Sequence, residues 1–188
     1  MDHTVEYVPA PNLNEKWEEG PARIRAACES LDIPSKFLYF NDDFFIMQPI
    51  GEIPILNCGS LLHQIKRCKV RSKYAESLSR TYHFLRKCGK SQQLSPLSYE
   101  LHIPMPVDKG KMLAVIEMTR GMVWPQYRSL YGNIHEMGGM PVGDPKIFSK
   151  TLYAPYGPFA STTDISFTQG VIGEQLRAMF PDPCRYEV

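Results

Sequence analysis

The sequence predicts a single domain that mixes helices with short strands, of the α/β or α+β class. Its 188 residues suffice for one sizeable core and are few for two domains. Hydrophobic residues make up 43% of the chain and charged residues 22%, a balance that allows such a core. Helical stripes of apolar residues and a short continuous apolar run occur in the same chain. We therefore expect one domain over residues 1–188.

The first predicted elements are a helix and a buried strand. Pro21 suits a first helical turn, and one face of residues 21–30 carries apolar side chains at helical spacing, namely Ile24, Ala27, Cys28 and Leu31. Residues 37–40 (FLYF) form a continuous apolar run, which is typical of a strand buried on both faces. This strand is expected to end at Asn41.

An acidic turn, formed by Asn41, Asp42 and Asp43, follows this predicted strand. Burial of an ionised carboxylate without a partner costs several kcal/mol, so these side chains need a strand end, a partner or a cation. Ligands in open α/β sheets bind beyond the carboxyl ends of strands, where Mg²⁺ and Mn²⁺ take carboxylate oxygens together with substrate phosphates. The pattern indicates a metal and diphosphate site. The alternative is a tight turn in which Asn and Asp cap backbone N–H groups.

A basic helical region is predicted over residues 59–89. Nine Lys and Arg residues lie between Lys66 and Lys90, and an apolar stripe runs through Tyr74, Leu78, Tyr82 and Leu85. Such a basic surface suits phosphates, nucleic acid or an anionic acceptor, and a solvated helix face is the alternative. Because no base-reading motif accompanies the charge, we do not expect nucleic acid to bind at physiological salt.

The remaining chain predicts a turn, a long loop and a final helix. The turn is WPQYRSLYGN, the loop covers residues 137–158, and the helix covers residues 169–180. Loops of that length often serve as lids or binding loops. His102 lies among apolar residues and prolines at a strand or edge position, where a single histidine is structural more often than functional.

Bulk properties exclude several classes of protein. A net charge of +1 gives no overall argument for nucleic acid or a membrane surface. No apolar run approaches the roughly 18 residues of a membrane span, and the first residues lack the features of a signal peptide. We therefore expect a cytoplasmic protein without a membrane partner. The five cysteines are odd in number and form no CxxC pair, so they predict neither a zinc nor a redox motif.

Four segments, taken in order, resemble the successive blocks of one family: FLYFNDDFF, LHIPMP, QYRSLYGN and FPDPCRYE. They are similar to blocks of the Stealth family of sugar-phosphate transferases and of related small phage-type glycosyltransferases. NEKWEEGPARIRAA also resembles the family's stretch before its acidic motif, so the resemblance covers most of the chain from Asn14 onward. It implies an α/β fold of the GT-A-like, nucleotide-diphospho-sugar transferase type, with a mixed sheet and flanking helices.

The resemblance also implies roles for individual residues. Asp42 and Asp43 match the acidic pair that binds Mn²⁺ or Mg²⁺ and the diphosphate of the donor. His102 is then expected to donate a hydrogen bond or a proton, and Arg128 to give bidentate donors to phosphate. Asp164 is expected to bind metal or to accept the proton of the acceptor hydroxyl. Further phosphate contacts are expected from Lys16, Arg23 and Asn41. Four of these residues, Asp43, His102, Arg128 and Asp164, should line one pocket.

The chain departs from the family pattern at its start. GT-A enzymes usually begin with a βαβ half that holds the nucleoside of the donor, and no glycine-rich strand–turn–helix opening precedes NEKW here. The base is then bound loosely, or a second chain completes the donor site, or the chain no longer catalyses. The functional hypotheses are a metal-dependent glycosyltransferase or sugar-phosphate transferase that uses a nucleotide-sugar donor, a non-catalytic partner subunit, and a nucleic-acid-binding module.

Overall fold

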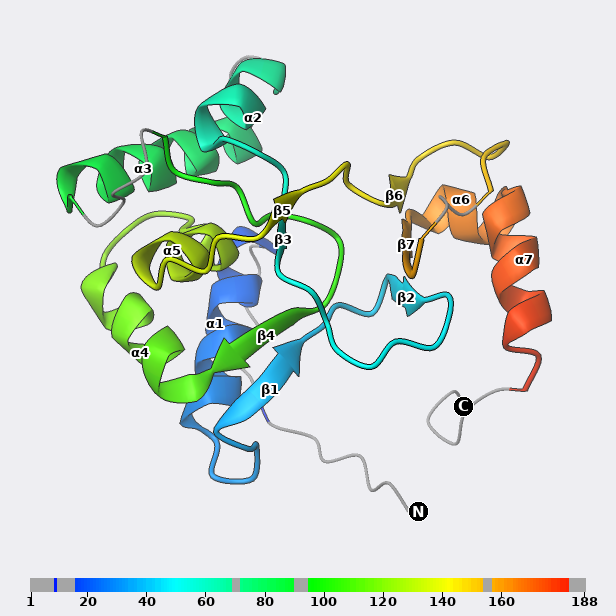
Figure 1. The fold of residues 1–188 in the computed structure, drawn as a ribbon, viewed down its shortest axis with the longest axis horizontal. Coiled ribbons are helices and arrows are strands. Elements are labelled where there is room, and N and C mark those ends of the chain that lie inside the picture. The colour runs from blue at the N-terminus through cyan, green and yellow to red at the C-terminus, as the bar shows by residue number, and fades with distance from the viewer. Residues whose placement is uncertain (1–8, 10–15, 69–71, 90–94, 154–156, 183–188) are drawn as a thin grey trace. The chain divides into compact units, whose positions relative to one another are not determined.

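The computed structural model describes residue 9 and residues 16–68, 72–89, 95–153 and 157–182. These residues form a mixed α/β fold with seven helices and three small sheets (Figure 1), which confirms the expected mixture of helices and strands. The chain divides into two compact units, each assembled from three separated segments. The single domain expected over residues 1–188 stays a prediction.

The first unit comprises Met1–Tyr39, Pro54–Glu100 and Met105–Val142. Its elements, in chain order, are α1 (Lys16–Glu29), β1 (Lys36–Tyr39), β3 (Leu56–Asn57), α2 (Leu61–Arg67), α3 (Lys73–Lys87), β4 (Met105–Asp108), α4 (Lys109–Met118), α5 (Tyr127–Ile134) and β5 (Met140–Pro141). Strand β1 pairs with β4 in antiparallel fashion, and β3 pairs with β5 in parallel. Helix α4 contacts α1, α5 and β4, and α2 contacts α3 (Figure 1).

The core of the first unit is aliphatic and lies among these helices. Six of its side chains are 0% exposed: Leu61, Leu78, Leu85, Met112, Val115 and Leu130. Full burial of such a side chain contributes about 1.5–3 kcal/mol, so this cluster is the main source of stability of the unit. Leu78 and Leu85 belong to the stripe predicted for α3, and their inward placement is confirmed, whereas Tyr74 of the same stripe is 37% exposed.

Helix α1 starts earlier than predicted, at Lys16, and Pro21 lies inside it. Ile24 and Cys28 are buried at 2% exposure, as the helical spacing predicts. Leu31 is 97% exposed because the helix ends at Glu29, two residues before it. Burial raises the pKa of the Cys28 thiol to about 11, so the thiol stays protonated at neutral pH.

The prediction that residues 37–40 form a strand buried on both faces is wrong. Strand β1 pairs with β4 in a two-stranded ribbon, and its residues alternate between exposed and half-buried, so a single face of it is covered. Phe37 and Tyr39 pack against the core, while Leu38 is 47% and Phe40 41% exposed. A continuous apolar run does not distinguish a strand covered on one face from a central strand, because both kinds of strand are rich in β-branched and aromatic residues.

The helical region predicted over residues 59–89 is two helices rather than one. Ser60 caps α2 by accepting a hydrogen bond from His63 N at 3.1 Å. Ser72 caps α3 in the same way, accepting from Ala75 N at 3.1 Å. Each serine side chain satisfies a donor that the first turn of a helix leaves free, so two N-termini form within the basic region. Lys69, Arg71 and Lys90 lie outside the described residues.

The turn predicted for WPQYRSLYGN is wrong over most of its length, because Tyr127–Ile134 form helix α5. Gly132 and Asn133 are typical of turns, but in the structure they allow close packing and buried hydrogen bonds. A Cβ on Gly132 would lie 2.4 Å from ring carbons of Tyr99, so this glycine lets the two elements approach. The Asn133 side chain donates to Leu97 O at 2.7 Å and to Ser129 O at 2.6 Å, and accepts from Leu97 N at 2.8 Å.

The second unit comprises Phe40–Ile53, Leu101–Pro104 and Gly143–Val188. Its elements are β2 (Phe44–Ile46), β6 (Lys146–Ile147), β7 (Phe159–Thr162), α6 (Asp164–Gln169) and α7 (Val171–Met179). Strand β7 is central and fully buried, with β2 antiparallel on one side and β6 parallel on the other. Ile147, Ile172 and Leu176 form a small separate core beneath it.

The final helix predicted over residues 169–180 is also divided. Gly170 ends α6 and precedes α7 (Figure 1). A Cβ on Gly173 would lie 1.7 Å from Phe167 O, so glycine there permits α7 to pack directly on the backbone of α6. Thr163 and Ser166 form a reciprocal capping box at the start of α6. None of the helices in the described ranges has the length and apolar character needed to cross a membrane.

Replacement of Asn133 by Ala should destabilise the first unit by about 2–4 kcal/mol, because the N–H and C=O of Leu97 would lose their partners in a buried place. Urea unfolding followed by circular dichroism measures this change. Lys87→Ala, at an exposed position near the end of α3, is the control and should change stability by less than about 0.5 kcal/mol. Equal effects of the two substitutions would contradict the structural role of Asn133.

Candidate functional site

The acidic turn lies at the start of β2 in the second unit. Asn41 O accepts a hydrogen bond from Phe44 N at 3.3 Å, which closes a tight turn. Asn41 and Asp42 are exposed, and the Asp43 side chain is 31% exposed. Within the described residues neither carboxylate caps a local backbone N–H. Asp43 Oδ2 instead pairs with Lys146 Nζ at 2.5 Å.

This ion pair joins two segments that are 103 positions apart in the sequence. The Lys146 side chain is 14% exposed, so the pair is largely removed from water. Each of these partly dehydrated charges is stabilised by the other, so removal of one leaves the other without compensation. Lys146 therefore explains how a carboxylate is accommodated in this apolar stretch.

Residues of the three strands form one row across the sheet. Phe44 of β2, Ser161 of β7 and Lys146 of β6 are directly opposite one another, so their side chains share one face. Ser161 is 0% exposed, and its Oγ has no hydrogen-bond partner in the part of the chain that the structure describes. A buried hydroxyl without a partner is unusual, so the row offers an unused donor and acceptor beside Lys146.

His102 and Asp144 form a second pair. His102 Nδ1 lies 2.8 Å from Asp144 Oδ2, and His102 N donates to Asp144 Oδ1 at 3.1 Å. Burial alone would raise the pKa of Asp144, but the hydrogen bonds and charge of His102, with the backbone N–H of Lys146, outweigh it and lower this pKa below its ordinary 3.8. Asp144 is therefore ionised at neutral pH, and it orients the imidazole.

The two pairs are neighbours. The Phe44 ring meets the His102 ring edge to face, with centroids 5.8 Å apart and an interplanar angle of 76°. Asp144 precedes Lys146 by two residues, so residues 144–146 contribute Asp144 to the pair with His102 and Lys146 to the pair with Asp43. We call the set Asp43, His102, Asp144, Lys146 and Ser161 the candidate site. It combines a cation, two carboxylates, a partly exposed imidazole and a buried hydroxyl, with Lys146 and Ser161 on the sheet and the other residues in the segments beside it.

Asp164 lies at the same end of the sheet as Asp43. Thr162 N donates to Asp43 O at 3.3 Å, and Asp164 follows Thr162 by two residues as the first residue of α6. The Asp164 side chain is exposed. Its position in the first turn is favourable for a carboxylate, so it has a structural explanation as well as the predicted catalytic one.

The other predicted site residues belong to the first unit. Arg128 is 7% exposed, with its guanidinium carbon 5.6 Å from the centroid of the Tyr39 ring. Arg23 is exposed and pairs with Glu19 one helical turn earlier, at 3.3 Å. Lys16 begins α1, but its side chain lies outside the described residues. Because Asp43, His102 and Asp164 are in the second unit, the single pocket shared with Arg128 stays a prediction.

The chemistry of the acidic turn suits a hard divalent cation. Among the described residues no three His, Cys, Asp or Glu side chains come together to hold a metal. Mg²⁺ usually needs only one or two carboxylates, with water and substrate phosphates supplying the other oxygens. Asp42 is exposed, and Lys146 engages only the Oδ2 atom of Asp43. Asp42 and Asp43 Oδ1 could therefore hold the cation together with a bound phosphate.

The basic region carries an aromatic contact that sequence analysis missed. Lys73 Nζ and the Arg80 guanidinium lie 5.1 and 5.2 Å from the centroid of the Trp124 ring, and Arg80 also pairs with Glu76. Cation–π contacts of this kind contribute about 0.5–1 kcal/mol at exposed sites. Part of the positive charge thus has a structural use in the first unit.

Three residues of the candidate site were also missed: Asp144, Lys146 and Ser161. The signal that could have found Asp144 and Lys146 is the charged pair on both sides of Pro145 in a loop expected to bind ligand. No sequence signal marks Ser161, because a serine in a short strand is common.

Comparison of the chain with protein-family models, with curated proteins and with solved structures gives no match.

Substitution of Asp144 by Asn should destabilise the second unit in a pH-dependent way. The lowered pKa means that the ionised carboxylate contributes stability above about pH 4, and that this contribution is lost as pH falls through the lowered value. The difference in unfolding free energy between wild type and Asp144→Asn should therefore shrink as the pH falls from about 5 to below about 4. Urea unfolding at several pH values measures it, with exposed Asp182→Asn as control. A difference that grows on acidification would contradict this account.

Proposed function

We propose that the candidate site handles the phosphates of a nucleotide-sugar donor, and that the protein is a metal-dependent glycosyltransferase or sugar-phosphate transferase with a GT-A-like fold. One observation carries the proposal. The Asp43–Lys146 pair and the His102–Asp144 pair lie next to each other beside one small sheet, although they come from three separated segments of the chain. A purely structural sheet does not need the Asp43–Lys146 pair, because an apolar side chain would fill the mostly buried position of Lys146 at lower desolvation cost.

Phosphate binding follows from the charges. Lys146 is held in place by Asp43 and can donate to a phosphate oxygen with the hydrogens that Asp43 does not use. Asp42 and Asp43 would hold Mn²⁺ or Mg²⁺, which would balance the negative charge that develops on the leaving diphosphate. Positioning and charge stabilisation of this kind supply most of the catalysis in transfers from a nucleotide diphosphate.

Proton transfer is assigned to His102. Since Asp144 Oδ2 accepts from Nδ1, the neutral ring carries its proton there, and Nε2 is free to accept one. Nε2 would take the proton of the acceptor hydroxyl as its oxygen attacks the transferred group, while the bond to the nucleotide phosphate breaks and its oxygen keeps the electron pair. The His102 side chain is 32% exposed, so an acceptor can reach it.

A non-catalytic partner subunit is the second candidate, and one observation favours it. The second unit exposes large apolar side chains within a short segment: Phe148 at 70%, Tyr153 at 69% and Leu152 at 57%. Exposed apolar side chains grouped in this way are typical of surfaces that another protein covers. A second chain on this surface would also be compatible with a donor site completed by a partner.

The first test of the transferase proposal is calorimetric titration with a panel of nucleotide sugars, with and without Mn²⁺. Wild type should bind one donor about tenfold or more tightly with Mn²⁺ than without it, because the cation bridges the acidic turn and the diphosphate. Asp42→Asn and Asp43→Asn should remove the effect of Mn²⁺, and the exposed Asp182→Asn should retain it.

Thermal unfolding of each variant shows whether it is folded, and Asp42→Asn keeps the test informative if loss of the Lys146 partner unfolds Asp43→Asn. Absence of heat with every common nucleotide sugar, from folded wild type, would contradict the transferase proposal and favour the partner subunit.

The second test concerns His102. His102→Gln should lower the rate of nucleotide release from the donor by about 10²–10⁴-fold while leaving donor affinity within about twofold, because the base acts on the acceptor and not on the donor. His63→Gln, at an exposed position in α2, is the matched control. Equal rates for His102→Gln and wild type would exclude His102 as the base.

A further inference from the structure

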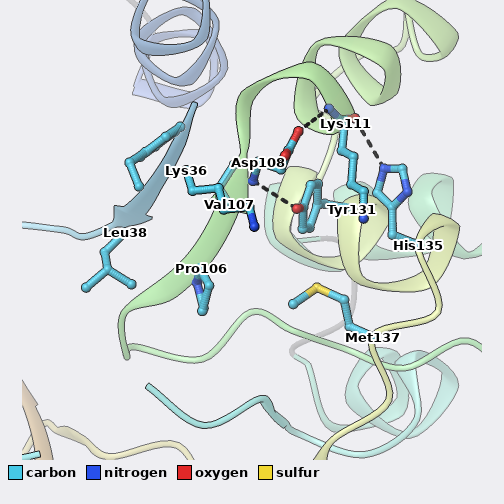
Figure 2. A pocket seen from close by; sticks show the side chains of 10 residues that line it. Lys36, Leu38, Pro106, Val107, Asp108, Lys111, Tyr131, His135 and Met137 are labelled. Atoms are coloured by element: carbon cyan, nitrogen blue, oxygen red, sulfur yellow. Dashed lines mark hydrogen bonds between the residues drawn. The ribbon is translucent and has the colours of Figure 1, made fainter. Parts of the chain in front are cut away.

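The first unit contains a pocket of about 450 Å³ to which neither the sequence analysis nor the proposed function gives a role. It lies between the β1–β4 ribbon and the end of α5. Figure 2 shows Lys36 and Leu38 of β1 on one side of it and Lys111, His135 and Met137 on the other. A volume of this size holds a ligand of one or two rings.

The walls of the pocket are largely apolar. Leu38, Pro106, Val107, Tyr131 and Met137 contribute to them. Tyr131 is fixed because its hydroxyl accepts a hydrogen bond from Asp108 N at 3.0 Å and its ring packs against His135, with centroids 4.9 Å apart. A preformed apolar wall of this kind favours a flat, apolar ligand body.

The charged groups at the pocket leave a net positive charge. In the described ranges, the amino groups of Lys36 and Lys111 have no hydrogen-bond acceptor and no ion-pair partner. Asp108 carries the opposing carboxylate, and its Oδ1 is used to cap α4 by accepting from Lys111 N at 3.0 Å. Two ammonium groups against one carboxylate favour a ligand with a single negative charge.

His135 adds directionality. Its Nε2 lies 3.2 Å from Lys111 O, and because a carbonyl only accepts, Nε2 carries the proton and the ring orientation is set (Figure 2). Nδ1 is then an acceptor in the neutral ring. The pocket is thus lined by an imidazole ring of fixed orientation, whose Nδ1 can accept a hydrogen bond from a ligand.

We propose that this pocket binds a small organic monoanion, with its acidic group at Lys36 and Lys111 and a flat apolar body against Tyr131 and Met137. The inference does not depend on the transferase proposal, since all ten lining residues belong to the first unit. A carboxylate and a phosphate ester share the required chemistry, and the probes below distinguish them.

The test uses three naphthalene probes on the full chain: 2-naphthoate, the phosphodiester methyl 2-naphthyl phosphate, which carries a single negative charge, and the neutral 2-naphthamide. Amide chemical shifts in ¹⁵N NMR spectra report the affinity and the place of binding. At least one anion should bind saturably, with shifts in β1, β4 and residues 131–137. 2-Naphthamide should bind about tenfold more weakly, as expected for loss of charge-assisted hydrogen bonds. The tighter anion identifies the acidic group.

Variants locate the charge. Lys111→Met and Lys36→Met should each weaken anion binding by about tenfold without changing the affinity for 2-naphthamide, and Lys66→Met on α2 should change neither. Leu38→Trp, at a half-exposed position of the pocket wall, should weaken all probes by filling the space.

Equal affinities for anions and amide, equal effects of Lys111→Met and Lys66→Met, or no saturable binding up to about 1 mM would each overturn the proposal.

Discussion

The ion pair between Asp43 and Lys146 is the interaction on which the arrangement of the candidate site depends. It connects the turn before β2 with β6, although the two strands are separated in the sheet by β7. Because Lys146 is mostly buried, its charge is poorly compensated without Asp43, so the pair favours one register of the two outer strands around β7. That register places Phe44, Ser161 and Lys146 in one row and brings Asp144 close to His102. The electrostatics of the site thus follow from one partly buried ion pair and the pairing of three short strands.

The same physical rule, that buried polar groups need partners, organises the first unit without producing the candidate site. Asn133 pairs both backbone groups of Leu97, and the Ser129 side chain accepts from Tyr99 N and donates to Glu100. These bonds explain why α5, rich in polar residues, is almost wholly buried. The block QYRSLYGN that supports the family resemblance therefore serves packing and hydrogen bonding in this unit, whereas the acidic turn and His102 belong to the second unit.

The sequence predicts the mixed α/β class, the inward residues Ile24, Cys28, Leu78 and Leu85, and the exposed acidic turn, because these follow from local periodicity and turn chemistry. It does not predict that β1 is half exposed, since which faces of a strand are covered is a tertiary property. It assigns WPQYRSLYGN to a turn because glycine and asparagine are common turn formers. In the structure, Gly132 instead makes room for the Tyr99 ring, and the Asn133 side chain hydrogen-bonds the backbone of Leu97, which the sequence alone does not reveal. Lys146 and Asp144 were missed for a similar reason, because their partners are 103 and 42 positions away.

We propose that the acidic turn and the row formed by Phe44, Ser161 and Lys146 make up a metal-assisted phosphate site. Paramagnetic broadening by Mn²⁺ in ¹⁵N NMR spectra tests it most directly, because the effect falls steeply with distance from the ion. In the presence of a nucleotide diphosphate, substoichiometric Mn²⁺ should selectively broaden the amide signals of residues 41–44, of Asp144 and Lys146, and of Thr162, whose N–H donates to Asp43 O. Broadening that is confined to other exposed carboxylates, such as Asp182, or that is uniform over the chain, would contradict the account.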